Sequence, residues 1–589
     1  MVAEVAFQER WSKPERWAWE QIRAGQIPNF NKDKDELDPR KPDGWNDERK
    51  LSPEFLKDIL LREAYRSAIP ITGVRIIGAW FREPVDLAHV RLDRQLWLRQ
   101  CRFEREVNLR DLRVDGWLSF GDSAFVVDPE KDLASLDLSF ARINGWLAID
   151  GALVAGNLDM ESLEVKQHLT IRSSARFQAN FKDVNLSRAK VDGQLDLTGA
   201  HVAGTLHMGS LEVKQNLRIS SGSKFQDVYL AGAKVDGELT MVGATFEGGL
   251  DMKFLTVGRY LVLHFANCIG EVSLAFAKVG FINLGGSSFS APVDATGLTV
   301  EGELTLIPPP TWADKARFVL RNAHVGALND GRGTNNPWPE EGKLVLDGFS
   351  YSRLGGFTEV SPRQVRWYIH DWLARDTSYT PQPYHQLAGV LRAHGDPSAA
   401  NTVLYAARER ERTEAWKGIK AGTIAKRVEA WLRWLGLSLL NRTIGYGLGG
   451  RYFRVLIWVV AFTLIGGAVL WYSGADKVRP ATAAEQSSRL ALAERKRADE
   501  AQPITQEHAL PDPKPGAAQA NPELRKGVGW CLWASLDWML PFIELDKAYT
   551  QSIAKLQGGP FYWLYVQALA GYVLAGFLAA GLAGLTQKS

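Results

Sequence analysis

A repeat of eleven residues runs through the sequence from residue 79 to residue 306. Each unit starts with a small residue or a leucine, and apolar residues follow two, six and eight positions later. Two successive units read Ala189, Val191, Leu195, Leu197 and Ala200, Val202, Leu206, Met208. A unit this short cannot bury its apolar side alone, so such a chain must stack its units to form a core.

The repeat has the character of short β-strands joined by regular corners. Alternating apolar residues such as Leu195 and Leu197 are typical of strands, and Asp-Gly or Asn-Gly pairs predict a turn at one place in the unit. Two units, 22 residues, would close one coil of a β-solenoid. An eleven-residue period also fits a right-handed helical coiled coil, but the repeated glycines and β-branched residues disfavour helix. We therefore expect a mainly β fold, with the solenoid over residues 71–310.

Flanking segments predict helical modules. At the N-terminal side, Ser12 and Glu15 form a capping-box pattern, and Ser52-Pro53-Glu54 predicts a second helix start. We expect residues 1–70 to cap the open edge of the solenoid. Residues 311–360 should hold degenerate strands and loops, and residues 361–415 a helical hairpin with its turn at Gly395.

Two apolar runs near the other end, residues 455–472 and 561–585, approach or exceed the about 20 residues that a membrane-spanning helix needs. Residues 416–454 predict a basic helix at the membrane surface. Positive charge before the first span predicts that this side, and the solenoid with it, lies in the cytoplasm. Six basic residues are expected to contact the membrane surface: Lys426, Arg427, Arg433, Arg442, Arg451 and Arg454.

Between the spans, residues 473–527 predict an exported flexible linker, followed by a short apolar segment over 528–545. This segment carries Asp537 and Pro541, and its length favours an interfacial helix, with a re-entrant pore-type helix as the alternative. Gln567 is the strongly polar residue of the second span. Gly576, Ala580 and Gly584 recur every four residues and predict close helix packing, either within the chain or between copies.

Signatures of chemistry are weak in this sequence. Gly445-x-Gly447-x-x-Gly450 matches a dinucleotide fingerprint, but the strand and acidic residue that the chemistry requires are missing. The Thr443-Ile444-Gly445-Tyr446-Gly447 segment is similar to a potassium-channel filter but precedes the first span, so we expect a turn there. Catalytic sets, metal-ligand spacings and cofactor sites are not found. The net charge of +3 gives no expectation of nucleic-acid binding.

The repeat resembles that of the pentapeptide-repeat-like β-solenoid proteins. The whole chain is similar to bacterial membrane-associated solenoid proteins that are sometimes catalogued as membrane-associated oxidoreductases. The similarity is carried by the solenoid and by LSPEFLKDILL, PYHQLAGVLRAHG and SLDWMLPFIEL. This resemblance implies the fold and a place in the bacterial inner membrane, and it implies no mechanism.

These patterns favour a non-enzymatic scaffold that is held in the lipid bilayer and presents a partner-binding solenoid surface to an unknown protein. The alternative is an oligomeric ion channel or pore-forming effector that the cytoplasmic solenoid gates. An enzyme ranks third, because the glycine match alone supports it. A homo-oligomer is compatible with both leading hypotheses.

Overall fold

The computed structural model describes most of the chain and divides it into two compact units, Met1–Val403 and Leu404–Ser589. All of the strands named below belong to the first unit. The described residues are 10–31, 37–126, 134–220, 222–331, 336–355, 362–376, 379–420, 423–474, 491, 527–540 and 558–586.

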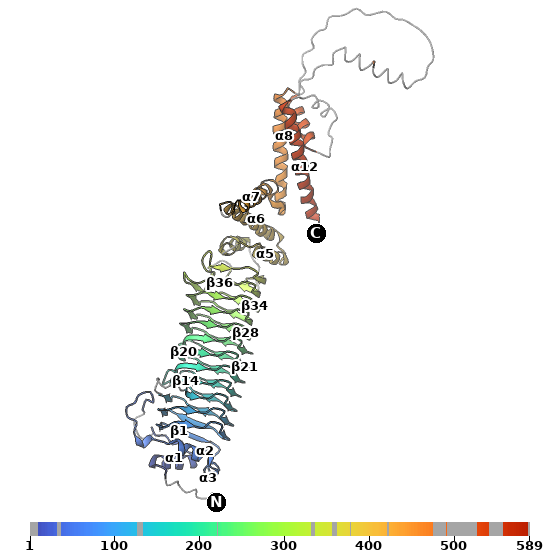
Figure 1. The fold of residues 1–589 in the computed structure, drawn as a ribbon. Coiled ribbons are helices and arrows are strands. Elements are labelled where there is room, and N and C mark those ends of the chain that lie inside the picture. Colours follow the sequence, from blue (N-terminus) through green and yellow to red (C-terminus); the bar gives the residue numbers. More distant parts are fainter. Residues whose placement is uncertain are drawn as a thin grey trace, which may run out of the picture. The chain divides into compact units, whose positions relative to one another are not determined.

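The first unit is built around a β-solenoid of about 12 turns, which runs from Val74 to Leu354 (Figure 1). Successive coils pair in parallel. In the first pairing, β1 (Val74–Ile77) lies beside β5 (Leu96–Arg99), and Val74 is opposite Leu96. The strands form two faces, a 20-stranded sheet that contains β1 and a 19-stranded sheet that contains β2 (Trp80–Phe81). The predicted solenoid and its 22-residue coil are therefore confirmed.

Columns of identical or similar apolar side chains fill the interior. Leu147, Leu169, Leu195 and Leu217 are opposite one another in successive coils, and each is fully buried. The rings of Phe81, Phe103 and Phe125 stack nearly parallel, with centroids 4.9 and 4.7 Å apart. In-register stacking about 4.8 Å apart thus turns each weak apolar side into one continuous core.

The Asp-Gly and Asn-Gly pairs lie at bends, as predicted, but their glycines serve close packing. A Cβ added to Gly193 would lie 2.2 Å from the carbonyl oxygen of Gln167 on the previous coil, and one on Gly237 would lie 2.5 Å from that of Gln215. The glycines of the four pairs within the repeat, Gly116, Gly145, Gly193 and Gly237, do not have a positive φ. Glycine is required because the previous coil passes too near for any side chain.

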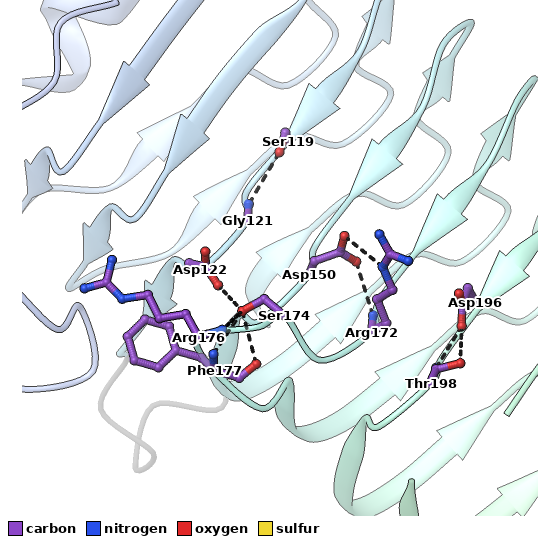
Figure 2. A network of polar contacts seen from close by, with 10 residues as sticks. All are labelled: Ser119, Gly121, Asp122, Asp150, Arg172, Ser174, Arg176, Phe177, Asp196 and Thr198. Atoms are coloured by element: carbon purple, nitrogen blue, oxygen red, sulfur yellow. Dashed lines mark hydrogen bonds and ion pairs between the residues drawn. The ribbon is translucent and has the colours of Figure 1, made fainter. Parts of the chain in front are cut away.

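A second kind of corner was not anticipated from the sequence. Between the two sheets the backbone turns through a left-handed residue, with φ of 50° at Asp111, 61° at Phe140 and 59° at Arg188. An Asp or Asn three residues earlier commonly prepares this corner. At Asp196, Oδ1 accepts the Thr198 N–H at 2.9 Å and the Thr198 hydroxyl at 2.6 Å, ahead of Gly199 (Figure 2). These local hydrogen bonds stabilise a turn that most side chains disfavour.

The N-terminal segment closes the first edge of the solenoid. It contains α1 (Lys13–Arg23) and α2 (Pro53–Leu61), whose N-cap Ser52 accepts the Phe55 N–H at 3.2 Å. Asn29 and Lys50 form isolated bridges with Ile77 and Trp80. The N-terminal chain therefore satisfies backbone groups that would otherwise invite pairing with another molecule.

The same N-terminal segment also reaches coils beyond the edge. Arg40 lies over the ring of Phe177 at 4.4 Å and donates to the carbonyl oxygen of Gly151 at 2.8 Å. Phe177 belongs to a loop that Ser174 holds in place. The Ser174 hydroxyl donates to Asp122 at 2.5 Å and accepts the Phe177 N–H at 2.9 Å (Figure 2). These contacts join separated parts of the first unit.

The solenoid extends further than the sequence indicated. In the expected region of degenerate strands, β36 (Phe318–Val319), β38 (Leu344–Val345) and β39 (Ser350–Leu354) continue the parallel pairing. The boundary near residue 310 was placed too early because longer, proline-containing connections hide the period. After β39, α4 (Pro362–Trp367) and α5 (Gln382–Ala393) follow.

Helix α5 covers the other end of the solenoid. The Gln382 side chain accepts the Gly348 N–H at 3.1 Å and donates to the carbonyl oxygen of Phe349 at 3.0 Å. At Gly395, with φ of 83°, the chain turns into α6 (Pro397–Ile419), as the predicted hairpin requires. Both exposed edges of the stack are thus covered by the chain itself.

The second unit is helical. It contains α7 (Ile424–Ile444), α8 (Arg454–Tyr472), α10 (Gly527–Met539) and α12 (Gly559–Thr586). Two of its helices are long and apolar enough to cross a membrane, over Arg454–Tyr472 and Gly559–Ala579. They match the two predicted spans. The predicted linker over residues 473–527 lies almost entirely outside the described residues. Pro541 lies outside them as well.

Replacement of the central ring in the phenylalanine stack provides a test of the stacked core. Phe103→Ala should lower the free energy of unfolding by about 3 to 5 kcal/mol, because it leaves a cavity between Phe81 and Phe125. Chemical denaturation of the full chain in detergent, followed by the β-sheet circular dichroism signal, measures this change.

The matched control is Phe254→Ala, which removes a ring that is 61% exposed and stacks on Phe276 at 5.5 Å. This substitution should lower the free energy of unfolding by about 1 kcal/mol or less. Equal effects of the two substitutions would contradict the assignment of the core.

Candidate functional site

The described residues offer two places where function could reside, the packed membrane-length helices and the outer surface of the solenoid. In the first, α10 packs against both α8 and α12. Cys531 and Ala534 of α10 are buried together with Leu470 and Leu564 from the two long helices. The short apolar segment is therefore a helix that packs against both long helices, and its interfacial or re-entrant placement stays a prediction.

A polar clasp joins these three helices; it consists of Gly466, Ser535 and Gln567. The Gln567 amide Nε2 donates to the Ser535 carbonyl oxygen at 2.9 Å and to its hydroxyl at 2.8 Å. The Gln567 Oε1 atom is buried, has no conventional hydrogen-bond partner in the described part of the chain, and faces Gly466. A Cβ added to Gly466 would lie 2.1 Å from this oxygen, so only glycine permits the approach.

Of the predicted membrane residues, Asp537 and Gln567 are both buried in this bundle. Of the three predicted helix-packing residues, Gly576 is the one whose surroundings the structure describes. Gly576 is exposed and a Cβ there would meet nothing within 4 Å, whereas the side chains at Ala580 and Gly584 lie outside the description. The close contacts instead occur at Gly466, Gly467 and Gly571. The adjacent glycines in the first span were the sequence signal that could have found them.

The segment that matches the dinucleotide fingerprint begins at the end of a helix. Gly445 is the left-handed C-cap of α7, with φ of 56°, and Tyr446 and Gly447 continue the turn with φ of 62° and 70°. The expected turn is therefore confirmed. The Tyr446 hydroxyl donates to Glu409 of α6 at 2.7 Å, and burial together with this hydrogen bond raises the pKa of Tyr446.

The predicted basic residues divide into two groups. Arg433 is paired with Glu411 at 2.7 Å, and Arg451 lies over the Tyr405 ring at 3.7 Å, so both hold α6 against the α7 region. Burial acts to raise the pKa of Glu411, but hydrogen bonds from Arg433 and Arg408 outweigh it and lower that pKa. Lys426, Arg427, Arg442 and Arg454 are exposed.

Helix α7 also exposes a row of apolar side chains, which we call the apolar stripe. Its members recur at helical spacing on one side of the helix and are between 43% and 80% exposed: Ile424, Val428, Trp431, Leu432, Leu435 and Leu439. A helix with an uncovered apolar stripe and basic neighbours has the composition of a membrane-surface helix.

On the solenoid, the outstanding surface feature is a tryptophan ladder formed by Trp97, Trp117 and Trp146. Ring centroids are 6.1 and 5.1 Å apart and the ring planes are within 14° of parallel. His168 continues the row at 5.1 Å with its ring turned by 80°. The ladder lies on the 20-stranded sheet, and Trp117 and Trp146 are 41% and 40% exposed.

The coil geometry builds this ladder. Trp117 and Trp146 each precede a strand of the same column, where Leu118 lies opposite Leu147. A Cβ on Gly145 would lie 2.5 Å from the Trp117 ring, so the glycine of this bend leaves room for the indole. The sequence shows the tryptophans, but only the coil register shows that they adjoin.

The positions of the metal-binding side-chain types bear on whether the chain could hold a metal ion. No group of three or more His, Cys, Asp or Glu side chains that could hold a metal ion occurs among the described residues. Cys101, Cys268 and Cys531 are buried free thiols, and burial raises the pKa of Cys101 and of Cys268 to about 12.

Comparison of the chain with known protein families, curated proteins and solved structures finds no match. The solenoid fold is thus established by the structure alone. The similarity to membrane-associated solenoid proteins remains a sequence-based expectation.

A test of the polar clasp uses two glycines of the long helices. Gly466→Leu should force α8 away from Ser535 and Gln567 and lower the thermal unfolding midpoint in detergent by several degrees, because the inserted side chain overpacks the bundle. Gly576→Leu is the control and should leave the midpoint nearly unchanged.

Disulfide cross-linking between α8 and α12 is a second measurement of the polar clasp. Leu470 and Leu564 belong to one buried cluster that also contains Cys531, so the test uses a Cys531→Ala background. In that background Leu470→Cys and Leu564→Cys together should cross-link, and they should lose this reaction when Gly466→Leu is added. Undiminished cross-linking would refute the clasp.

Proposed function

We propose that this protein is a membrane-anchored scaffold whose solenoid binds a protein partner through the tryptophan ladder. The exposed ladder is the observation that carries the proposal. Two indoles with about two-fifths of their surface in water form an apolar strip on a flat, rigid face. Exposed apolar patches mark interaction surfaces, and tryptophan dominates the binding energy of many interfaces.

The anchor is proposed to be the bundle of α8, α10 and α12, with α7 lying in the lipid headgroup layer. The apolar stripe would enter the acyl boundary while Lys426, Arg427 and Arg442 face anionic headgroups. The connection of α7 to α8 supports this placement, since the Trp458 indole N–H donates to the Arg442 carbonyl oxygen at 2.9 Å. The inner membrane and a cytoplasmic solenoid are part of the same proposal.

An oligomeric channel is the second candidate, and it is supported by two polar residues, Asp537 and Gln567, in otherwise apolar helices. Polar residues within a membrane commonly line ion pathways. In the single chain, however, Gln567 holds its own helices together. Anchoring therefore ranks first. The oligomeric state in detergent separates the two, because a pore at the helix surfaces needs a ring of copies.

Cysteine labelling tests the placement of α7. In nanodiscs that contain anionic lipid, Leu432→Cys should react with a water-soluble maleimide about tenfold more slowly than Glu429→Cys, since lipid would cover the stripe. The three native thiols are buried and should give a low background. Equal rates at the two positions would contradict an interfacial α7.

Proximity labelling tests the partner surface. A biotin ligase is fused to the N-terminal side of the solenoid, and the proteins that it labels reproducibly are identified. In the double variant Trp117→Ala and Trp146→Ala, labelling of the partner should fall by at least about tenfold, because two such side chains contribute several kcal/mol at an interface.

The control removes another exposed aromatic pair, Phe254→Ala with Phe276→Ala. Labelling that survives the ladder variant, or that falls equally with both, would overturn the proposed binding surface.

A further inference from the structure

A polar groove with a volume of about 480 Å³ lies on the 19-stranded sheet, away from the sheet that carries the tryptophan ladder. Three neighbouring parallel strands form its floor: β14 (Leu153–Asp159), β17 (Asn180–Asn185) and β20 (His201–His207). Asp159 lies opposite Asn185, and Asn185 lies opposite His207. This groove is independent of the membrane anchor and of the ladder.

Strand geometry points the polar side chains outward. Leu158, Val184 and Leu206 of the three strands are buried in the core, so the residues on either side of each face the groove. A register irregularity interrupts each pairing just before this point, between Val154 and Asn157 in the first strand. Such bulges re-aim side chains and are common beside functional sites.

Two carboxylates are held firmly through one oxygen each. Asp159 Oδ1 accepts the Glu161 N–H at 3.0 Å and the Asn185 side-chain N–H at 3.1 Å. Asp183 Oδ1 accepts the Thr205 N–H at 2.7 Å. A Cβ on the residue before Thr205, Gly204, would lie 2.3 Å from that same oxygen, so the chain leaves room for the carboxylate.

The second oxygen of each carboxylate remains without a protein partner among the described residues. Neither Asp159 nor Asp183 forms an ion pair there, and no Lys or Arg is among the described residues that line the groove. Burial and the nearby Asp137 raise the pKa of Asp159. Arg110, whose charge acts on Asp159, donates to Ser139 instead at 3.2 Å.

We propose that the polar groove binds a guanidinium group, as presented by an arginine side chain. Adjacent-strand spacing and a two-residue offset place the Asp159 and Asp183 Cα atoms about 8 Å apart, which is near enough for one planar group with donors on several edges to reach both carboxylates. His207, stacked on Tyr229 at 5.1 Å, adds a flat wall at the end of the groove.

The chemistry disfavours other cations. A bare metal ion would have only two carboxylates here, since no metal-type cluster exists among the described residues. A lysine ammonium is a compact charge and lacks the fork that reaches two separated carboxylates. The guanidinium could belong to a protein segment or to a small free compound, and the experiment separates these sources.

The test measures binding of a fluorescein-labelled Ala-Ala-Arg-Ala-Ala peptide to the full chain in detergent by fluorescence anisotropy. Matched peptides carry lysine or citrulline in place of arginine, and unlabelled arginine amide serves as competitor. The arginine peptide should bind at least about tenfold more tightly than either matched peptide. Asp159→Asn or Asp183→Asn should weaken it by at least about tenfold.

Both substitutions keep the Oδ1 acceptor that holds the local fold, so lost binding reports the lost charge. Asp251→Asn is the control: this residue lies one coil beyond Tyr229, pairs with Lys253 at 3.4 Å and should leave binding unchanged.

The competitor decides the source of the group. Arginine amide that competes as well as the peptide assigns the groove to a free guanidino compound, whereas stronger peptide binding assigns it to a protein segment. Absence of binding by both, or binding that Asp159→Asn and Asp183→Asn leave intact, overturns the proposal.

Discussion

In-register stacking of 22-residue coils is the constraint on which the first unit depends. Each strand of two to seven residues is too short to be stable by itself, and it gains its hydrogen bonds and its apolar neighbours only from the coils on either side. The columns Leu147 to Leu217 and Phe81 to Phe125 show the result. Any residue that shifts the register of one coil would disturb those next to it.

The same regularity leaves two edges open, and the chain closes both. Backbone bridges from Asn29 and Lys50 cover the first edge, and the Gln382 side chain covers the last. The outer surface is then free to carry functional side chains at fixed spacing. Because stacking places side chains of successive coils about 4.8 Å apart, it forms the tryptophan ladder on one sheet and the polar groove on the other.

Under the proposed anchoring, the helical unit follows different physics. Within lipid, apolar burial gives helices little drive to associate, so small residues and buried hydrogen bonds must stabilise their packing. The polar clasp has both elements, with Gly466 allowing the approach and Gln567 donating to Ser535. The sequence pointed to Gln567 as exceptional because an amide is rare in an apolar run, but its partner on α10 could not be read from spacing.

The sequence alone determined the elements whose cause is local or periodic: the solenoid, the 22-residue coil, the Gly395 turn and the two apolar helices. Their patterns repeat often enough to be read without contacts. Tertiary structure decided what depends on neighbours distant in sequence. The left-handed corners, the continuation to Leu354, the burial of α10 and the packing at Gly466 in place of Gly576 all belong to this second class. Which side chains share a surface depends on the insertions between coils, so the groove between Asp159 and Asp183 became visible only once the register was known.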